Sequence, residues 1–417
     1  MKKYKVIIVG GGPAGSMTAL HLADARPEMA GDILLLEARS FPREKICGGG
    51  LSGRVVTWLE TLDVTLEKIP KIGVNRLTAC FGDELYVAPF GNGGSCVIRR
   101  SSFDHLLLEA AREKGAHVRT STPVTGAYRE EEGITVVDKA GNKYHGEVMV
   151  GADGVNGRSR IWFGVPHRSR KRLLLQADFP GHPDVPMLKN GLVMDYGASR
   201  FGVSGYVWFF PSVGEEGEPL LNAGIASAEF ARGGAARLRE AFLSVLERHP
   251  EIKAIAPRHI RFKAYPERDY AIFQPKSLER VLFVGEQLGV DSFTGEGLSI
   301  CADSASAAAQ EIVHALERGD YSFKGYSMRL AKCHFFPLLV PGKFFWLEKP
   351  GLEPSLMLSM ATRKPPPGKE NSMEIYVKIY SGARPGSFAY SPYSLRTIAR
   401  DFGWAAADRL RRRLGKR

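Results

Sequence analysis

The amino-acid sequence predicts a mixed α/β fold with an N-terminal βαβ unit, an inserted, mostly antiparallel sheet and a helical C-terminal region. Three observations predict it. A glycine-rich turn at residues 10–15 joins a β-branched run to a helical stretch. Strand-like segments dominate residues 166–270. A short apolar run and a long alanine-rich helical stretch then follow.

The βαβ unit begins the chain. Residues 3–9 are the β-branched run of a buried strand, and residues 14–25 have helical periodicity. Residues 33–36 form a second apolar run that ends at Glu37. Because parallel strands need a crossover between them, we expect the helix to connect two neighbouring parallel strands.

The later elements follow from the same patterns. Turn residues at 140–142 between alternating runs predict a hairpin over residues 134–144. The expected helices are 103–114, 235–247 and 297–316, and the expected strands are 147–150, 191–196, 205–210 and 281–284. The expected domain bounds are 1–165 and 271–330 for two parts of one domain, 166–270 for the inserted sheet, and 331–417 for the C-terminal region.

The C-terminal region carries much of the positive charge in a chain whose formal net charge is +12. A proline-rich linker at 364–369 precedes an amphipathic helix expected over residues 395–414. This helix suits an anionic membrane surface or a phosphorylated substrate, or is a solvated helix end. The basic cluster at the C-terminal end consists of Arg409, Arg411, Arg412, Arg413, Lys416 and Arg417.

We expect a cytoplasmic protein whose contact with a membrane, if made, is peripheral and on the inner face of the cell membrane. The apolar run at residues 6–9 is too short for a signal peptide. The apolar stretch 335–347 contains prolines, a glycine and a lysine, and falls short of the roughly 20 residues that span a bilayer. It either packs under the rest of the chain or inserts at a membrane interface.

The five cysteines predict a reducing compartment, because they are odd in number and scattered along the chain. Their spacing matches no zinc motif, so we expect no metal site. The sequence contains no zinc finger, RRM signature or basic heptad, so we expect no nucleic-acid partner.

The glycine-rich turn has the spacing of a dinucleotide-binding motif. Residues 10–15 read GGGPAG, and Glu37 follows Gly15 by 22 residues at a strand end. Gly10 permits the tight turn, Gly12 lets the backbone approach a pyrophosphate, and Gly15 allows close helix packing. The helix N-terminus offers N–H groups to the anion, and the acid suits ribose hydroxyls. The motif does not separate FAD from NAD.

Two downstream segments resemble motifs of the p-hydroxybenzoate hydroxylase-like flavoproteins. Residues 151–154 (GADG), ahead of Arg158 and Arg160, resemble the DG motif. Residues 284–286 (VGE), followed by 294–298 (TGEGL), resemble the GD motif, with Glu286 in place of the usual Asp. The resemblance implies a Rossmann-type FAD-binding domain in which a helix N-terminus points at the flavin. That arrangement stabilises the negative charge of a reduced flavin.

Within that group the sequence is most similar to geranylgeranyl reductases, over about residues 1–330. The matching segments are 41–51 (FPREKICGGGL), 100–104 (RSSFD), 206–211 (YVWFFP) and 294–298. The resemblance implies FAD as cofactor, substrate binding by Tyr206, Trp208 and Phe210, and catalysis involving Cys47, Tyr206 and Trp208. It assigns cofactor binding to Gly10, Gly12, Pro13, Ala14, Gly15, Glu37, Ala38, Arg39, Lys45, Cys47, Gly48, Arg100, Val124, Asp153, Gly154, Gly285, Glu286, Gly295, Gly297 and Leu298.

The implied reaction is saturation of carbon–carbon double bonds in an isoprenoid substrate by hydride from reduced flavin. The electron donor is expected to be NAD(P)H or ferredoxin, and the proton donor is Cys47, Tyr206 or a water. Two rival hypotheses stay open. One is a monooxygenase or halogenase on the same fold that acts on an aromatic or lipophilic small molecule, since 206–211 also resembles a halogenase WxWxIP segment. The other is a non-catalytic or electron-transfer flavoprotein.

Overall fold

The computed structural model describes residues 3–90, 94–169, 171–182, 184–227, 234–291, 295–334, 336, 339, 365–380, 384 and 391–414.

A first sheet, of eight strands, carries the βαβ unit. Four of its strand pairs are parallel and give the order β18 (Val281–Phe283), β11 (Lys143–Gly151), β1 (Lys3–Val9), β2 (Ile33–Leu36), β8 (His117–Arg119). Antiparallel strands complete its edges: β9 (Val124–Glu130), β10 (Gly133–Asp138) and β17 (Ser277–Leu278). The mixed α/β fold predicted from the sequence is confirmed.

The register of the first sheet brings three strand ends together. Val9 pairs with Leu36 on one side and with Gly151 on the other. Gly10, Glu37 and Ala152 therefore leave the sheet at the same edge. In parallel sheets this carboxyl edge is where ligands bind.

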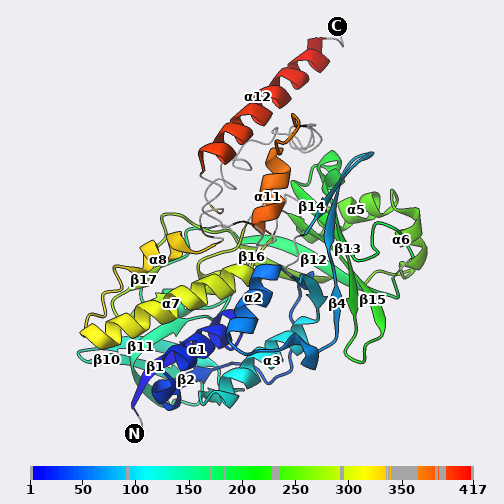
Figure 1. Ribbon diagram of the computed structural model, residues 1–417. Helices are drawn as coiled ribbons and strands as arrows, with labels where there is room; N and C mark the ends of the chain where they lie inside the picture. Colours follow the sequence, from blue (N-terminus) through cyan, green and yellow to red (C-terminus); the bar gives the residue numbers. More distant parts are fainter. Residues whose placement is uncertain are drawn as a thin grey trace.

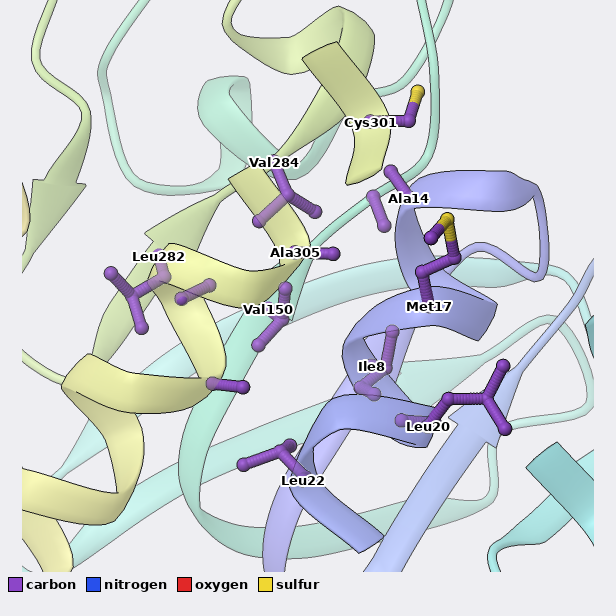
Figure 2. Packing of buried hydrophobic residues seen from close by; sticks show 14 of the residues in the cluster. Ile8, Ala14, Met17, Leu20, Leu22, Val150, Leu282, Val284, Cys301 and Ala305 are labelled. Carbon is purple, nitrogen blue, oxygen red and sulfur yellow. The ribbon is translucent and has the colours of Figure 1, made fainter. Parts of the chain in front are cut away.

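Three helices pack on this sheet: α1 (Pro13–Ala25), α3 (Arg100–Glu113) and α7 (Leu298–Arg318). Figure 2 shows Met17 and Leu20 of α1 in the buried cluster with Ile8 of β1 and Ala305 of α7. Small residues on α7 let it pack closely beside α1 (Figure 1).

A second sheet, of seven strands, faces the carboxyl edge of the first. Its order is β16 (Lys263–Arg268), β12 (Lys171–Pro180), β15 (Pro219–Ser227), β14 (Gly205–Val213), β13 (Gly191–Asp195), β5 (Arg76–Phe81), β6 (Glu84–Pro89). All neighbours are antiparallel except β13 and β5. Helix α5 (Gly234–Leu246) covers one face, and the other face turns toward the βαβ unit (Figure 1).

The smaller elements join these layers. A three-stranded sheet contains β3 (Gly50–Leu51), β7 (Cys96–Ile98) and β4 (Lys71–Gly73). The remaining described α-helices are α2 (Gly53–Thr61), α4 (Ser159–Trp162), α6 (Pro250–Ile255), α8 (Tyr326–Lys332), α11 (Ser372–Tyr380) and α12 (Pro392–Leu414).

Two C-terminal helices extend from the body in the view of Figure 1. The buried Asp401 of α12 accepts hydrogen bonds from the backbone N–H and the hydroxyl of Ser372, both at 2.8 Å, and so fastens α12 to α11. Among the described helices, none has the length and apolarity that crossing a bilayer requires. The stretch 335–347 lies outside the described residues apart from 336 and 339, as do residues 415–417.

Most expected elements agree with the structure within three residues, and two differ informatively. The helix expected from 103 begins at Arg100, because the Arg100–Asp104 ion pair, one helical turn apart, supports the first turn. The hairpin arm and the strand expected at 147–150 form one continuous strand, β11. Position 146, within β11, requires a glycine, because a side-chain carbon there would be only 2.8 Å from Ile7 Cγ1. This glycine does not end the strand.

The second sheet also includes residues 76–89, which precede the expected inserted segment 166–270. Strand pairing over such a sequence distance leaves no local signal, so short strands of this kind are easily assigned to the wrong layer. The domain bounds given above remain a proposal.

Candidate functional site

A cavity of about 900 Å³ lies where the carboxyl edge of the first sheet meets the second sheet. Its walls come from the glycine-rich turn, the loop at residues 43–52, the start of α7 and the inner face of the second sheet. All the residues expected to bind cofactor line this cavity except Gly15 and Gly285. Tyr206, Trp208 and Phe210 line it too. The structure thus brings the expected site residues together.

The glycine-rich turn forms one end of the cavity. Gly10 has φ +110°, and a side-chain carbon there would lie 2.4 Å from the Ala152 carbonyl oxygen. At Gly15 the same carbon would lie 1.9 Å from the Gly10 carbonyl oxygen, so Gly15 serves packing within the turn. Helix α1 starts at Pro13, and no described side chain caps its N-terminus. Its first N–H groups are therefore available to an anionic ligand.

Glu37 is held rigidly beside this turn. Its two carboxylate oxygens accept hydrogen bonds from Gly11 N (2.8 Å) and Arg39 N (2.9 Å). Arg43 lies 3.9 Å from the same carboxylate and 3.3 Å from Asp104. Ala38, Arg39 and Val124 complete this part of the wall. A fixed, buried carboxylate at the end of β2 suits the hydroxyls of a ribose.

The loop at residues 45–50 crosses the middle of the cavity. Lys45 Nζ lies 3.2 Å from the ring centroid of Tyr265 and 3.9 Å from Glu286. The guanidinium of Arg100 holds Asp104 through two hydrogen bonds of 2.7 and 3.0 Å and also interacts with the Cys47 thiol. Arg100 thereby positions the loop as well as lining the cavity.

Asn222 links this loop to the second sheet and was missed by the sequence reasoning. Its side chain accepts a hydrogen bond from Trp208 Nε1 and donates one to the Cys47 carbonyl oxygen, both at 2.8 Å. The residue is buried on β15. A lone asparagine within an apolar strand was the available signal, because a buried amide needs partners.

The DG-like segment contacts its own loop. Asp153 accepts hydrogen bonds from Arg158 N (2.7 Å), Ser159 N (2.9 Å) and the Ser159 hydroxyl (2.6 Å). Arg160 is fully buried and donates to the carbonyl oxygens of Gln287 and Pro275. The Asp153 carboxylate thus holds its own loop in place. Gly154, Asn156 and Trp162 line a further part of the cavity.

The segment after β18 brings the start of α7 to the cavity. Gly285 has φ +59° and packs against α1, where a side-chain carbon would lie 2.6 Å from Ala14 Cβ. Glu286, Gly295, Gly297 and Leu298 line the cavity, and Thr294 lies outside the described residues. The longer Glu286 side chain keeps its carboxylate at the wall, paired with Lys45.

The inner face of the second sheet is an aromatic and apolar wall. The ring centroids of Tyr206 and Trp208 are 6.3 Å apart, and those of Tyr206 and Tyr196 are 5.8 Å apart. A side-chain carbon at Gly48 would lie 3.0 Å from the Phe210 ring, so the loop touches this wall. The wall also includes residues that the sequence reasoning did not select, although alternation along β5 and β13 offered a signal: Leu77, Ala79, Leu192, Met194 and Tyr196.

Burial perturbs the acids of this region. Desolvation raises the pKa of the Tyr206 hydroxyl well above 10, so this phenol keeps its proton at neutral pH. Desolvation also raises the pKa of Glu267, although Arg172 at 3.2 Å opposes the shift. The cavity combines a polar, charged arm around the glycine-rich turn and Glu37 with an apolar arm formed by the side chains of β5, β13 and β14.

The polar arm fits FAD. At Gly12 a side-chain carbon would meet only Arg43 Nη2, at 3.4 Å, so the bare backbone there leaves room for a pyrophosphate. The α1 N-terminus presents N–H donors, and Glu37 is fixed beside the turn, where its carboxylate can accept hydrogen bonds from a ribose. The start of α7 supplies a second helix N-terminus further along the same cavity.

Comparisons with known proteins agree with this fit. Residues 3–211, half of the 417-residue chain, match the family model described as "FAD binding domain". A digeranylgeranylglycerophospholipid reductase of Thermoplasma acidophilum is 25% identical over 337 residues, which cover 77% of this chain and 81% of that protein.

Solved structures show the same fold at lower identity. A geranylgeranyl bacteriochlorophyll reductase-like protein from Thermoplasma acidophilum has a TM-score of 0.73 at 21% identity, with 98% of each chain covered. A flavin-dependent brominase has a TM-score of 0.72 at 17% identity, covering 99% of this chain and all of that one. The family match, the fold and the fitted polar arm lead to one conclusion: the chain belongs to the FAD binding domain family and is an FAD-dependent oxidoreductase.

Proposed function

We propose that the protein saturates carbon–carbon double bonds of an isoprenoid, geranylgeranyl-type substrate. The observation that carries the proposal is the contact between the loop at residues 45–50 and the aromatic wall at Gly48, Trp208 and Phe210. The apolar arm begins where the cofactor arm ends, so an apolar chain in it reaches the cofactor. The printed names of the similar reductases support the same substrate class.

The chemistry places specific demands on the cavity. Bound and reduced, FAD supplies hydride from its N5 atom. An isolated alkene has no carbonyl to polarise, so the wall must hold it at about 3 to 3.5 Å from the reacting atom in a dry environment. Tyr206 and Trp208 present aromatic faces that bind prenyl units and stabilise developing positive charge. Asn222 bonds to both Trp208 of the aromatic wall and Cys47 of the loop, which holds the two arms of the cavity in a fixed relative position.

The proton comes from a group at the junction of the arms. Cys47 and Tyr206 both line it, and a water there is the third candidate. The raised pKa of Tyr206 makes this phenol a weak acid, although it remains a hydrogen-bond donor. Exchanging Cys47 for Ser and Tyr206 for Phe separates the candidates by the pH dependence of turnover.

The partners belong to the same proposal. NAD(P)H or a reduced ferredoxin delivers electrons, and the basic C-terminal region brings the protein to a lipid surface by peripheral contact. Each donor is tested by supplying it alone to the oxidised protein under anaerobic conditions. Sedimentation with anionic vesicles, repeated at high salt, tests the membrane contact.

The direct experiment is anaerobic. The protein is reduced with dithionite and mixed with geranylgeranyl diphosphate or a geranylgeranyl lipid, and flavin absorbance is followed. We expect reoxidation that depends on the substrate. Reduced flavin that is stable in its presence contradicts the proposal.

A second candidate function is an oxygen-dependent monooxygenase or halogenase. The likeness of fold to the flavin-dependent brominase favours it. Reoxidation by oxygen coupled to a hydroxylated or halogenated product supports this candidate. A flavin that is reduced and reoxidised without any organic product supports an electron-transfer protein.

A further inference from the structure

Three potential metal ligands meet on the outer face of the second sheet. Cys80 of β5 and Asp195 of β13 are register partners on neighbouring strands, and His249 precedes α6. Their ligand atoms all lie within 4.8 Å of one another. Cys80 and Asp195 are each 1% exposed, and the His249 side chain is 10% exposed.

This cluster is separate from the FAD cavity. On β5 the cavity is lined by Leu77 and Ala79, and on β13 by Leu192 and Met194. Side chains alternate along a strand, so Cys80 and Asp195 point to the opposite face. They lie in the core beneath α5, and the ring of Phe209 stands 5.2 Å from that of His249.

We propose that Cys80, Asp195 and His249 form a zinc site with three protein ligands. A thiolate, an imidazole and a carboxylate are the ligand types that zinc takes in proteins. In a tetrahedral site the ligand atoms stand about 3.3 to 3.6 Å apart. The His249 Nε2 to Asp195 Oδ2 distance, now 2.7 Å, has to open by less than about 1 Å for zinc to replace the shared proton.

The surroundings support a metal at this position. Asp195 Oδ1 accepts a hydrogen bond from Gly197 N at 2.6 Å, which orients the carboxylate and leaves Oδ2 for the metal. One thiolate and one carboxylate neutralise a divalent cation, so the loaded site carries no net charge into the core. Three protein ligands leave the fourth position of a tetrahedral zinc to a further ligand such as water.

With zinc bound, the site links β5 and β13 to the segment that precedes α6. These three segments are far apart in sequence.

A nucleophilic thiol with an Asp–His pair is the alternative for these residue types. The geometry opposes it, because His249 Nε2 faces Asp195 and Cys80 is buried away from the cavity. Alkylation of Cys80 in the folded, metal-free protein at the rate of a free thiol would support the alternative and contradict the zinc site.

The test uses the full-length, FAD-bound protein. It is stripped with a chelator, titrated with Zn²⁺, and desalted, and bound metal is measured by mass spectrometry. Co²⁺ is then used as a probe, because tetrahedral Co²⁺ absorbs at longer wavelength than oxidised flavin and a thiolate ligand adds a charge-transfer band. We expect one equivalent of metal, a thiolate–cobalt band, and a higher Tm with zinc than without it.

Matched variants identify the ligands. Cys80→Ser and His249→Asn should lose the bound equivalent, and Cys80→Ser should lose the charge-transfer band. Cys96→Ser removes another buried thiol, on β7, and should keep both. A wild-type protein that retains no zinc and shows no thiolate–cobalt band overturns the proposal, whether or not the variants fold. Equal metal binding in wild type and Cys80→Ser also overturns it.

Discussion

At the scale of single residues, backbone N–H groups fix the acids that the site depends on. Glu37 is bonded to Gly11 and Arg39, and Asp153 to Arg158 and Ser159. Hydrogen bonds to a carboxylate are stronger than those between neutral groups. Each acid is therefore placed before a ligand arrives, and little conformational freedom remains to be lost on binding.

Removing the Glu37 carboxylate tests this placement. Glu37→Ala loses hydrogen bonds worth about 1.5 to 3 kcal/mol, so the Kd for FAD should rise about tenfold to hundredfold. Flavin fluorescence during titration of the apoprotein measures it. Glu28→Ala, at a side chain that is 68% exposed, is the control. Equal affinity in the two variants would show that Glu37 does not serve the cofactor.

His21 gives a residue-scale prediction about pH. It is buried on α1 against Trp58, and desolvation lowers its pKa to about 4. The folded state binds its proton less readily than the unfolded chain, where the pKa is 6.5. The contribution of His21 to the unfolding free energy is therefore most favourable above pH 6.5, where both states are unprotonated. It is lost as pH falls toward 4, because the unfolded chain then binds the proton more readily.

From pH 7 to pH 5 this residue should cost about 2 kcal/mol of unfolding free energy. Urea unfolding at both pH values measures the loss. His21→Phe keeps the ring contact and should remove that part of the difference. His182→Phe, at an exposed position, should leave the difference unchanged. The same pH dependence in all three proteins would contradict the assignment.

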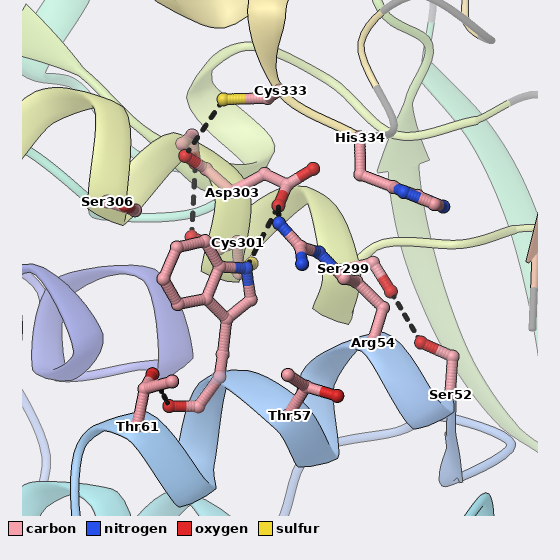
Figure 3. A network of polar contacts seen from close by, with 12 residues as sticks. Ser52, Arg54, Thr57, Thr61, Ser299, Cys301, Asp303, Ser306, Cys333 and His334 are labelled. Carbon is pink, nitrogen blue, oxygen red and sulfur yellow. Dashed lines mark hydrogen bonds and ion pairs between the residues drawn. The ribbon is translucent and has the colours of Figure 1, made fainter. Parts of the chain in front are cut away.

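At the scale of elements, a buried polar contact joins α2 to α7. Trp58 Nε1 donates to Asp303 Oδ1 at 3.0 Å, and Arg54 lies 3.6 Å from the same carboxylate. Cys333, just after α8, donates to the Asp303 carbonyl oxygen (Figure 3). Ser52 and Ser299 form a second link between the same two segments at 2.8 Å. These contacts hold the start of α7, which lines the cavity, against the loop at residues 43–52.

Trp58→Phe should lower the unfolding free energy by about 1 to 3 kcal/mol, because it leaves the buried Asp303 carboxylate with one donor fewer. Chemical denaturation of the FAD-free protein measures the loss, so that the wall position of Trp162 in the FAD cavity does not affect the control. Trp162→Phe is the matched control, since the Trp162 indole N–H has no partner among the described residues. An equal loss in both variants would trace the effect to aromatic packing and contradict the role of the hydrogen bond.

The sequence predicted the elements better than their assembly. The elements of the βαβ unit are determined by residues close together in the sequence, so its strands, helix and glycine turn could be predicted from the sequence pattern alone. The placement of β5 beside β13 and the Asn222 bridge depend on pairing across more than a hundred residues. The meeting of Cys80 with His249 has the same origin. The motifs of the first sheet and of β14 were found because their residue types are specific, whereas the apolar wall on β5 and β13 has an ordinary strand pattern.

At the scale of the whole molecule, the two sheets form different parts of the cavity. The first sheet contributes the glycine-rich turn and the helix N-termini to the cavity, and the second contributes the aromatic side chains of Tyr206, Trp208 and Phe210. The cavity between them joins a charged arm to an apolar one. Asn222 at the junction links β15 of the second sheet to the loop at residues 43–52. The proposed reaction rests on this arrangement, because it requires FAD and an alkene to meet in one cavity.

The most direct test of this account is the mass of the lipid recovered from a single anaerobic turnover. Dithionite-reduced protein is mixed with less than one equivalent of geranylgeranyl lipid, and product mass and flavin oxidation are measured on the same sample. The account predicts one saturated bond, seen as the gain of a hydrogen pair, for each flavin reoxidised. Unchanged lipid beside flavin that stays reduced until oxygen enters would contradict it.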